Sequence, residues 1–237
     1  MTAALSSSTS SSPVAAFTPD TVSVVIGGSS GIGRAVAQAL GQRPGRVVVA
    51  GLSTGLDVAD ADAVRAFFDE LGPVDHVVVT AGSQAPGGAV TAVDLDAAKA
   101  AFDVKFWGAI AVAQAAAPHL RPGGTLTLTS GFLARRTVPG AFVKTAMNAA
   151  LEVSAKLLAR ELAPLRVNVV SPGLTDTEAY AGLAPEAREA MLAKAAASLP
   201  AGRVGQPSDL AAGYLFAIDN AFMTGAVIDL DGGALIQ

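Results

Sequence analysis

A glycine-rich turn, set between a short apolar run and a helical pattern, is the feature that most constrains this sequence. The apolar run Val22–Ile26 leads directly into Gly27, Gly31 and Gly33, and a helical pattern follows over residues 32–40. Glycines in these positions permit a tight turn, close approach of a ligand to the backbone, and close packing of the helix on the strand. The N–H groups at the start of such a helix attract anions. The segment therefore predicts a strand–turn–helix unit that binds a pyrophosphate.

Apolar runs alternate with helical patterns along the rest of the chain. Runs without polar alternation indicate strands that are buried on both faces, and their alternation with helices indicates a parallel, doubly wound sheet. Further strands are predicted at 46–50, 74–79, 125–129, 165–170 and 226–230, and helices at 60–71, 94–117, 140–163, after Pro185 and after Pro207. Asp60 is a candidate N-cap. We predict one α/β domain with a Rossmann fold over residues 21–237, with helices on both faces of the sheet.

Composition excludes several classes of function. Of the 237 residues 51% are hydrophobic and 15% are charged, which is incompatible with a mainly disordered chain. The net charge of −4 argues against a nucleic acid or an anionic membrane as partner. The sequence has no cysteine and only two histidines, so we predict no disulfide and no metal site. These limits favour a small-molecule substrate.

The first 20 residues form a separate region. They are rich in serine and include Pro13, so we predict a disordered tail over residues 1–20. No Lys or Arg precedes Arg34, so this region lacks the positive charge of a secretory signal. Together with the absence of cysteine, this favours a cytoplasmic protein.

Several ordered motifs resemble those of the short-chain dehydrogenase/reductase family, from Thr21 to the C-terminus. They are Gly-x-x-x-Gly-Ile-Gly at 27–33, Asp57-Val58, Ala81-Gly82, Arg166-Val167-Asn168 before Ser171-Pro172-Gly173, Thr177, and Asp231-Gly232-Gly233. The resemblance implies a Rossmann-type oxidoreductase that uses NAD(P)(H) on a carbonyl, alcohol or imine. It also implies a homo-oligomer, tetramer or dimer, with Trp107 at an interface, and a substrate lid over about 174–204.

The turn and the resemblance together predict a set of cofactor-binding residues. They are Gly27, Ser29, Ser30, Gly31, Ile32, Gly33, Ser53, Asp57, Val58, Ala81, Gly82, Lys144, Pro172, Gly173, Thr175 and Thr177.

The end of the second strand normally selects the dinucleotide. An acidic residue there binds the ribose 2′-OH of NAD, whereas Arg accommodates the 2′-phosphate of NADP. This chain has Ala50-Gly51-Leu52-Ser53-Thr54, with neither signal. Because no acid repels a phosphate, and hydroxyls and Arg34 lie nearby, we predict that NADP(H) is preferred over NAD(H). The short distance from Ala50 to Asp57 indicates that the helix and strand usual at this point are missing.

The resemblance also exposes a departure at the catalytic positions. Ser130 matches the family serine that orients the substrate, and Lys144 matches the lysine that binds the nicotinamide ribose. Gly140 stands where the family has the tyrosine that acts as general acid, and Lys105 stands where it has an asparagine. We therefore predict a catalytic site at Ser130, Lys144, Lys105 and Gly140 in which protons are delivered in an unusual way.

Other residues are candidates to replace the missing acid. Burial can lower the pKa of a lysine such as Lys105 enough for proton donation. Tyr180 falls in the predicted lid, and Arg135 and Arg136 could bind an anion or stabilise an oxyanion. Tyr214 falls on a helix where a core or interface position is the expectation. Two further interpretations stay open: a protein that binds a dinucleotide without turnover, as sensor, scaffold or partner subunit, and a non-redox isomerase or dehydratase.

Overall fold

The strands form a parallel sheet. The chain adds its second strand on one side of the first strand and all later strands on the other side. The computed structural model describes residues 17–82 and 85–236, which hold a six-stranded parallel sheet in the order β2-β1-β3-β4-β5-β6. The strands are β1 (Val22–Ile26), β2 (Arg46–Ala50), β3 (Val74–Val79), β4 (Leu120–Thr129), β5 (Arg166–Pro172) and β6 (Val227–Leu230). The predicted α/β Rossmann fold is confirmed.

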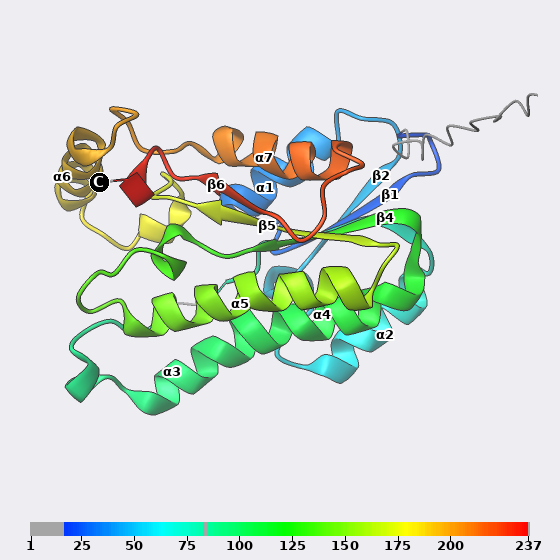
Figure 1. The fold of residues 1–237 in the computed structure, drawn as a ribbon, viewed down its shortest axis with the longest axis horizontal. Helices are drawn as coiled ribbons and strands as arrows, with labels where there is room; N and C mark the ends of the chain where they lie inside the picture. Colours follow the sequence, from blue (N-terminus) through cyan, green and yellow to red (C-terminus); the bar gives the residue numbers. More distant parts are fainter. Residues whose placement is uncertain (1–16, 83–84, 237) are drawn as a thin grey trace, which may run out of the picture.

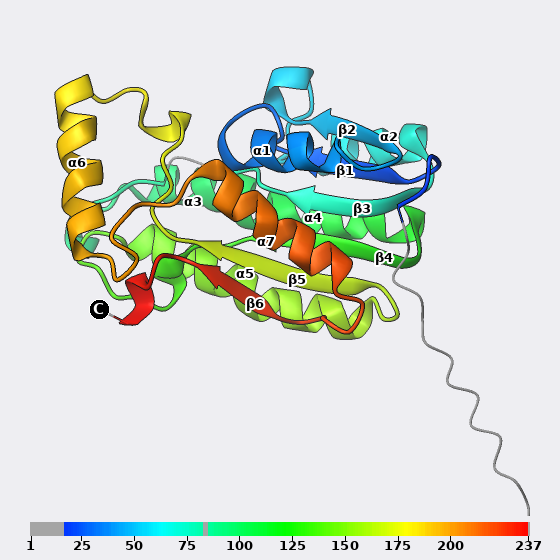
Figure 2. The same cartoon turned by 90° about the horizontal axis from the view of Figure 1, so that it is seen from above.

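Helices cover both faces of this sheet (Figures 1 and 2). They are α1 (Gly31–Leu40), α2 (Ala61–Leu71), α3 (Leu95–Phe102), α4 (Gly108–Ala116), α5 (Phe142–Glu161), α6 (Pro185–Ser198) and α7 (Pro207–Asp219). Helices α1 and α7 pack together on one face, and α2, α4 and α5 cover the other. Helix α6 stands at one end of the molecule, beside the C-terminus.

The reversal of strand order between β1 and β3 creates a place where a ligand can bind. The chain runs from β1 outward to β2 and then returns to β3 on the other side of β1. In open α/β sheets, ligands bind outside the carboxyl ends of the strands at such a reversal. Between β2 and α2 the chain forms only a short 3-10 turn, Leu52–Thr54, and adds no strand beside β2. β2 is therefore the edge strand of the sheet. The predicted trimming after the second strand is confirmed.

Three stretches differ from the sequence-based expectation. The strand expected over 125–129 begins earlier, since β4 starts at Leu120. The helix expected over 94–117 is interrupted by a π-helical turn, Asp103–Trp107, between α3 and α4. Periodicity does not reveal such a turn, because the apolar positions continue through it. The structured chain also begins before Thr21: Phe17 packs on the core and its ring lies 5.0 Å from that of His76. Residues 1–16 of the predicted tail lie outside the described residues.

Burial matches the doubly wound arrangement. Val24, Val25, Val77 and Val78, on the interior strands β1 and β3, are fully buried because helices cover both sides. Asp60 accepts hydrogen bonds from the N–H groups of Asp62 and Ala63, at 3.0 Å each, which confirms it as the N-cap of α2. No helix among the described residues is long and apolar enough to cross a membrane.

Candidate functional site

The glycine-rich turn fits tightly against the end of β3. A Cβ on Gly33 would lie 2.2 Å from the carbonyl oxygen of Gly27 and 2.4 Å from Thr80 Oγ1. Gly27 itself has a φ of +85°, which side chains rarely permit. Thr80 fixes the contact, because its N–H and its hydroxyl both donate to the carbonyl of Ile26, at 2.8 and 3.0 Å. The turn can therefore follow this path only with glycine at these positions.

Two adjoining cavities open at this turn. One, of about 410 Å³, lies at the start of α1 and is lined by Gly27, Ser30, Gly31, Ile32, Gly33, Thr80, Gly82, Thr129, Thr177, Glu178 and Ala179. The other, of about 610 Å³, extends toward β2 and is lined by Gly27, Ser29, Ser30, Gly51, Leu52, Ser53, Leu56, Asp57, Val58, Thr80, Ala81, Gly82 and Val104. Because they share Gly27, Ser30, Thr80 and Gly82, they form one cleft along the carboxyl ends of β1, β2 and β3. An extended ligand with an anionic centre fits such a cleft.

Most of the residues predicted to bind a cofactor line this cleft. The turn residues from Gly27 to Gly33 other than Gly28, together with Ser53, Asp57, Val58, Ala81, Gly82 and Thr177, are brought together here. The predicted residues that line neither cavity are Lys144, Pro172, Gly173 and Thr175. Thr175 is buried, and its hydroxyl donates to the carbonyl of Gly173 at 3.1 Å.

The β2 end of the cleft carries less positive charge than the sequence suggested. Ser53 lines the cavity, but the Thr54 hydroxyl donates to the carbonyl of Gly51 at 2.9 Å. Arg34 pairs with Glu178. Of the three residues that favoured NADP(H), only Ser53 lines this end of the cleft, because Arg34 and Thr54 line neither cavity.

Lys105 is placed at the carboxyl edge of the sheet by the π-helical turn. Its Nζ donates a long hydrogen bond, 3.4 Å, to the carbonyl oxygen of Ser130 at the end of β4. Burial lowers the pKa of the Lys105 amine to about 8. No carboxylate among the described residues forms an ion pair with it. π-Helical turns are frequent at functional sites. Lys105 can therefore be both a proton donor and a proton acceptor near neutral pH.

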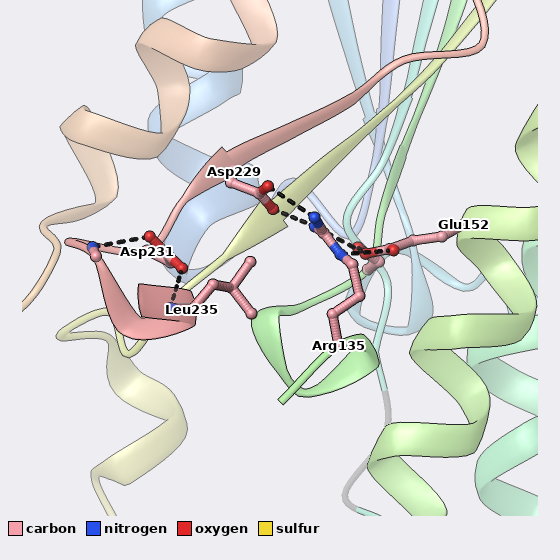
Figure 3. Close-up of polar contacts among 7 residues, drawn as sticks. Arg135, Glu152, Asp229, Asp231 and Leu235 are labelled. Carbon is pink, nitrogen blue, oxygen red and sulfur yellow. Dashed lines mark hydrogen bonds and ion pairs between the residues drawn. The ribbon is translucent and has the colours of Figure 1, made fainter. Parts of the chain in front are cut away.

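Ser130 belongs to a partly buried polar network with Glu152, Arg135 and Asp229, of which Figure 3 labels the last three. Its hydroxyl donates to Glu152 Oε1 at 2.9 Å, and Glu152 Oε2 lies 3.0 Å from Arg135 Nε. Arg135 also donates from Nη1 to Asp229 Oδ2 at 2.8 Å. The network joins β4, α5 and β6. Because the Ser130 hydroxyl donates its proton to the hydrogen bond with Glu152, Ser130 can only accept a hydrogen bond from a substrate.

The two arginines considered as anion ligands are held by protein groups. Arg135 bridges Glu152 and Asp229, and this pairing raises its pKa, with the hydrogen bond to Asp229 as the largest cause. Arg136 donates to the carbonyl of Ala234 at 2.8 Å. Nearby, the Asp231 carboxylate accepts hydrogen bonds from the N–H groups of Gly233 and Leu235; Figure 3 labels Asp231 and Leu235. These contacts fasten the chain after β6.

Gly140 and Lys144 lie at the entrance to α5. Gly140 has a φ of +82° and precedes the helix, which begins at Phe142. Its carbonyl accepts from the N–H of Gly88 at 3.0 Å, which ties two loops together. Lys144, on the first turn of α5, is exposed. The position where the family carries its tyrosine is therefore a left-handed bend.

The two tyrosines occupy different environments. Tyr214 is fully buried, and its hydroxyl lies 2.6 Å from Thr129 Oγ1; burial raises its pKa. This confirms a core position. Tyr180 is partly buried in the segment after Thr177, and burial raises its pKa as well. Both tyrosines lie beside residues that line the cleft, Tyr214 through Thr129 and Tyr180 through Ala179, but Tyr180 is the less buried of the two.

Sequence reasoning missed several residues of the site. Thr80 and Glu178 line the cleft, and Glu152 holds Ser130. Asn148 is 8% exposed, and its Oδ1 has no hydrogen-bond partner among the described residues. The position of Thr80 just before Ala81-Gly82 was the available signal for that residue. The contacts of Glu178 and Glu152 join distant segments and leave no local pattern.

Comparisons with known proteins agree with this geometry. A family model described as enoyl-(acyl carrier protein) reductase matches residues 26–234. "Short-chain dehydrogenase/reductase ATR9" from Stachybotrys chlorohalonatus is 32% identical over 90% of this chain and 96% of its own length. "Carbonyl reductase family member 4" from Danio rerio is 30% identical over 90% of this chain and 97% of its own length.

A solved structure is also similar. It is a small-chain dehydrogenase in complex with NADPH, 52% identical, with a TM-score of 0.90 over 92% of this chain and all of that one. The fold, the glycine-rich cleft and these similarities together establish that the chain belongs to the short-chain dehydrogenase/reductase family of oxidoreductases.

Proposed function

We propose that this protein binds NADP(H) in the cleft and catalyses hydride transfer between the nicotinamide and the carbon of a small carbonyl, alcohol or imine. The observation that carries the proposal is the glycine-rich cleft, where a Cβ at Gly33 would lie 2.2 Å from backbone. Because no side chain fits on this turn, the backbone N–H groups at the start of α1 stay accessible to a pyrophosphate. A similar small-chain dehydrogenase was crystallised with NADPH, which supports the choice of dinucleotide.

The residues of the cleft would hold the cofactor in an extended form. The N-terminus of α1 at Gly31 would face the pyrophosphate, Ser53 and Asp57 would lie beside the adenosine, and Thr177 would lie near the nicotinamide end. When bound, the nicotinamide supplies or accepts the hydride. The protein itself must position the substrate and move one proton.

Lys105 is the group that we propose for proton transfer. In reduction, its ammonium would give a proton to the oxygen or nitrogen of the substrate as the hydride reaches carbon. In oxidation, the neutral amine would take that proton back. A pKa of about 8 places both forms within reach of physiological pH. An iminium substrate would need no proton, because its positive charge is already present.

The test is a titration followed by a turnover screen. We expect NADPH to bind more tightly than NADH by fluorescence, and the bound NADPH to be oxidised by at least one member of a panel of ketones, aldehydes and imines. Failure of both dinucleotides to bind would refute the proposal.

A second candidate is a protein that binds a dinucleotide without turnover. It is favoured by two observations: the Ser130 hydroxyl already donates to Glu152, and Gly140 supplies no acid. Tight binding of NADPH with no turnover on any member of the panel would support this candidate.

We also propose that the chain acts as a homo-oligomer. Trp107 (58% exposed), Val153 (62%) and Leu157 (57%) present large apolar side chains on the π-helical turn and on α5. Such surface is normally covered in an assembly. Light scattering coupled to size-exclusion chromatography should report a dimer or a tetramer, and a monomer at micromolar concentration would refute this proposal.

A further inference from the structure

Glu178 reaches back across the sequence to the start of α1. Its Oε2 accepts a hydrogen bond from the N–H of Gly31 at 2.9 Å, and its Oε1 pairs with the guanidinium of Arg34. The pKa of the Glu178 carboxyl is lowered, first by its own backbone N–H and then by Arg34, so it stays ionised. An anion therefore already sits at the N-terminus of this helix, held by one backbone donor and one arginine.

The position of this carboxylate overlaps the expected position of the cofactor. Gly31 and Glu178 line the same 410 Å³ cavity. In dinucleotide-binding folds, the pyrophosphate lies at the N-terminus of the first helix and uses these N–H groups. One N–H cannot serve two anions fully, so Glu178 and a pyrophosphate compete for Gly31.

Arg34 is also placed to change partner. It lies on the first turn of α1, and its guanidinium reaches the carboxylate that Gly31 binds. An anion that replaces this carboxylate at Gly31 comes within reach of the same guanidinium. Arginine binds carboxylates and phosphates with the same forked geometry. Both side chains are about half exposed, so they can rearrange without disturbing the core.

We infer that Arg34 is a ligand of the cofactor pyrophosphate, and that Glu178 occupies its place until the dinucleotide displaces the carboxylate. The inference rests on the proposed dinucleotide site. It assigns Arg34 to the phosphates that NADPH and NADH share, and not to the 2′-phosphate that distinguishes them. When the dinucleotide displaces the carboxylate, the segment Glu178–Tyr180 loses the contacts of Glu178 with Gly31 and Arg34 on α1.

The test compares both dinucleotides across two variants. For Arg34→Gln we expect the Kd values of NADPH and NADH to rise about tenfold, and by the same factor, because one charge-assisted hydrogen bond to a shared phosphate is lost. For Glu178→Gln we expect both Kd values to fall several-fold, because a neutral amide competes poorly for Gly31. Fluorescence titration measures all four values without any need for turnover.

A second ion pair supplies the matched controls. Arg65 and Asp62 form an exposed pair on α2, and we expect Arg65→Gln and Asp62→Asn to leave both Kd values unchanged. Unchanged affinities in Arg34→Gln, or a loss confined to NADPH, would overturn the assignment to the pyrophosphate. Unchanged or weaker binding in Glu178→Gln would overturn the competition. If the unmodified protein binds neither dinucleotide, the proposed function fails first and the inference falls with it.

Discussion

Two regions of the molecule differ in how far they follow the family pattern: the glycine-rich turn, here called the turn end, and the residues proposed for catalysis, here called the catalytic end. At the turn after β1, Gly27, Gly31 and Gly33 keep the pattern, and the backbone geometry requires glycine. At the catalytic end, Gly140 and Lys105 replace the expected tyrosine and asparagine. The turn depends on the absence of side chains, a demand that any dinucleotide imposes. The catalytic end depends on the substrate, so it is free to change.

The electrostatics of the two ends differ as well. The start of α1 concentrates positive potential from its N–H groups and from Arg34, and holds an acidic side chain there. The catalytic end combines two carboxylates, Glu152 and Asp229, with Arg135 between them and one lysine of lowered pKa nearby. The turn end is suited to hold an anion, and the catalytic end holds the lysine that we propose to move a proton.

The largest effect is expected at the turn. In Gly33→Ala the new methyl group would lie 2.2 Å from the Gly27 carbonyl oxygen, so the turn must shift. We expect NADPH affinity to fall about 100-fold, which corresponds to roughly 2.7 kcal/mol. Gly41→Ala, at the other end of α1, is the control, since its φ of −65° suits alanine. Equal NADPH affinities in Gly33→Ala and Gly41→Ala would contradict the claim that the turn requires glycine at position 33.

The next effect separates the turn end from the catalytic end. Lys105→Met keeps most of the volume and removes the titrating group. We expect kcat to fall by about 10²-fold or more, the usual contribution of general acid–base catalysis, while the Kd for NADPH stays within about twofold. Lys99→Met on α3, where the lysine is exposed and pairs with Asp96, is the control. Loss of NADPH binding in Lys105→Met would assign this lysine to the cofactor instead.

The pH profile gives Lys105 a signature that a structural role would not produce. Because its pKa is lowered to about 8, the ammonium form predominates below that pH and the amine above it. We expect kcat for reduction to decrease as the pH rises through about 8, and kcat for oxidation to increase over the same range. Both profiles should become flat in Lys105→Met.

The sequence predicted the turn end better than the catalytic end, for a physical reason. The turn is built from neighbours in sequence, and its glycines report a backbone path directly. The partners of Ser130 and Gly31, Glu152 and Glu178, come from distant segments, and a carboxylate on a helix carries no mark of what it will contact. The π-helical turn that places Lys105 was hidden for a similar reason, since an extra residue in one turn does not interrupt the apolar pattern.

A smaller effect concerns the network around Ser130. Glu152 is 7% exposed and receives both the Ser130 hydroxyl and Arg135. We expect Glu152→Gln to lower the free energy of unfolding by about 2 kcal/mol, because the buried ion pair is lost, and the Tm by roughly 4–8 °C. Glu161→Gln, exposed at the end of α5, should change the Tm by less than about 1 °C. A drop in kcat with no change in Tm would make Glu152 catalytic rather than structural.

The smallest effect tests whether the catalytic end can return to the family pattern. Gly140→Tyr restores the missing phenol in sequence, but Gly140 has a φ of +82° and lies before the first residue of α5. A tyrosine there costs about 1–2 kcal/mol of backbone strain and does not stand on the helix with Lys144. We therefore expect no gain in ketone reduction and a Tm lower by a few degrees. A gain of tenfold or more in kcat would show that the bend can become helical, and that the turn end and the catalytic end are less independent than their geometry indicates.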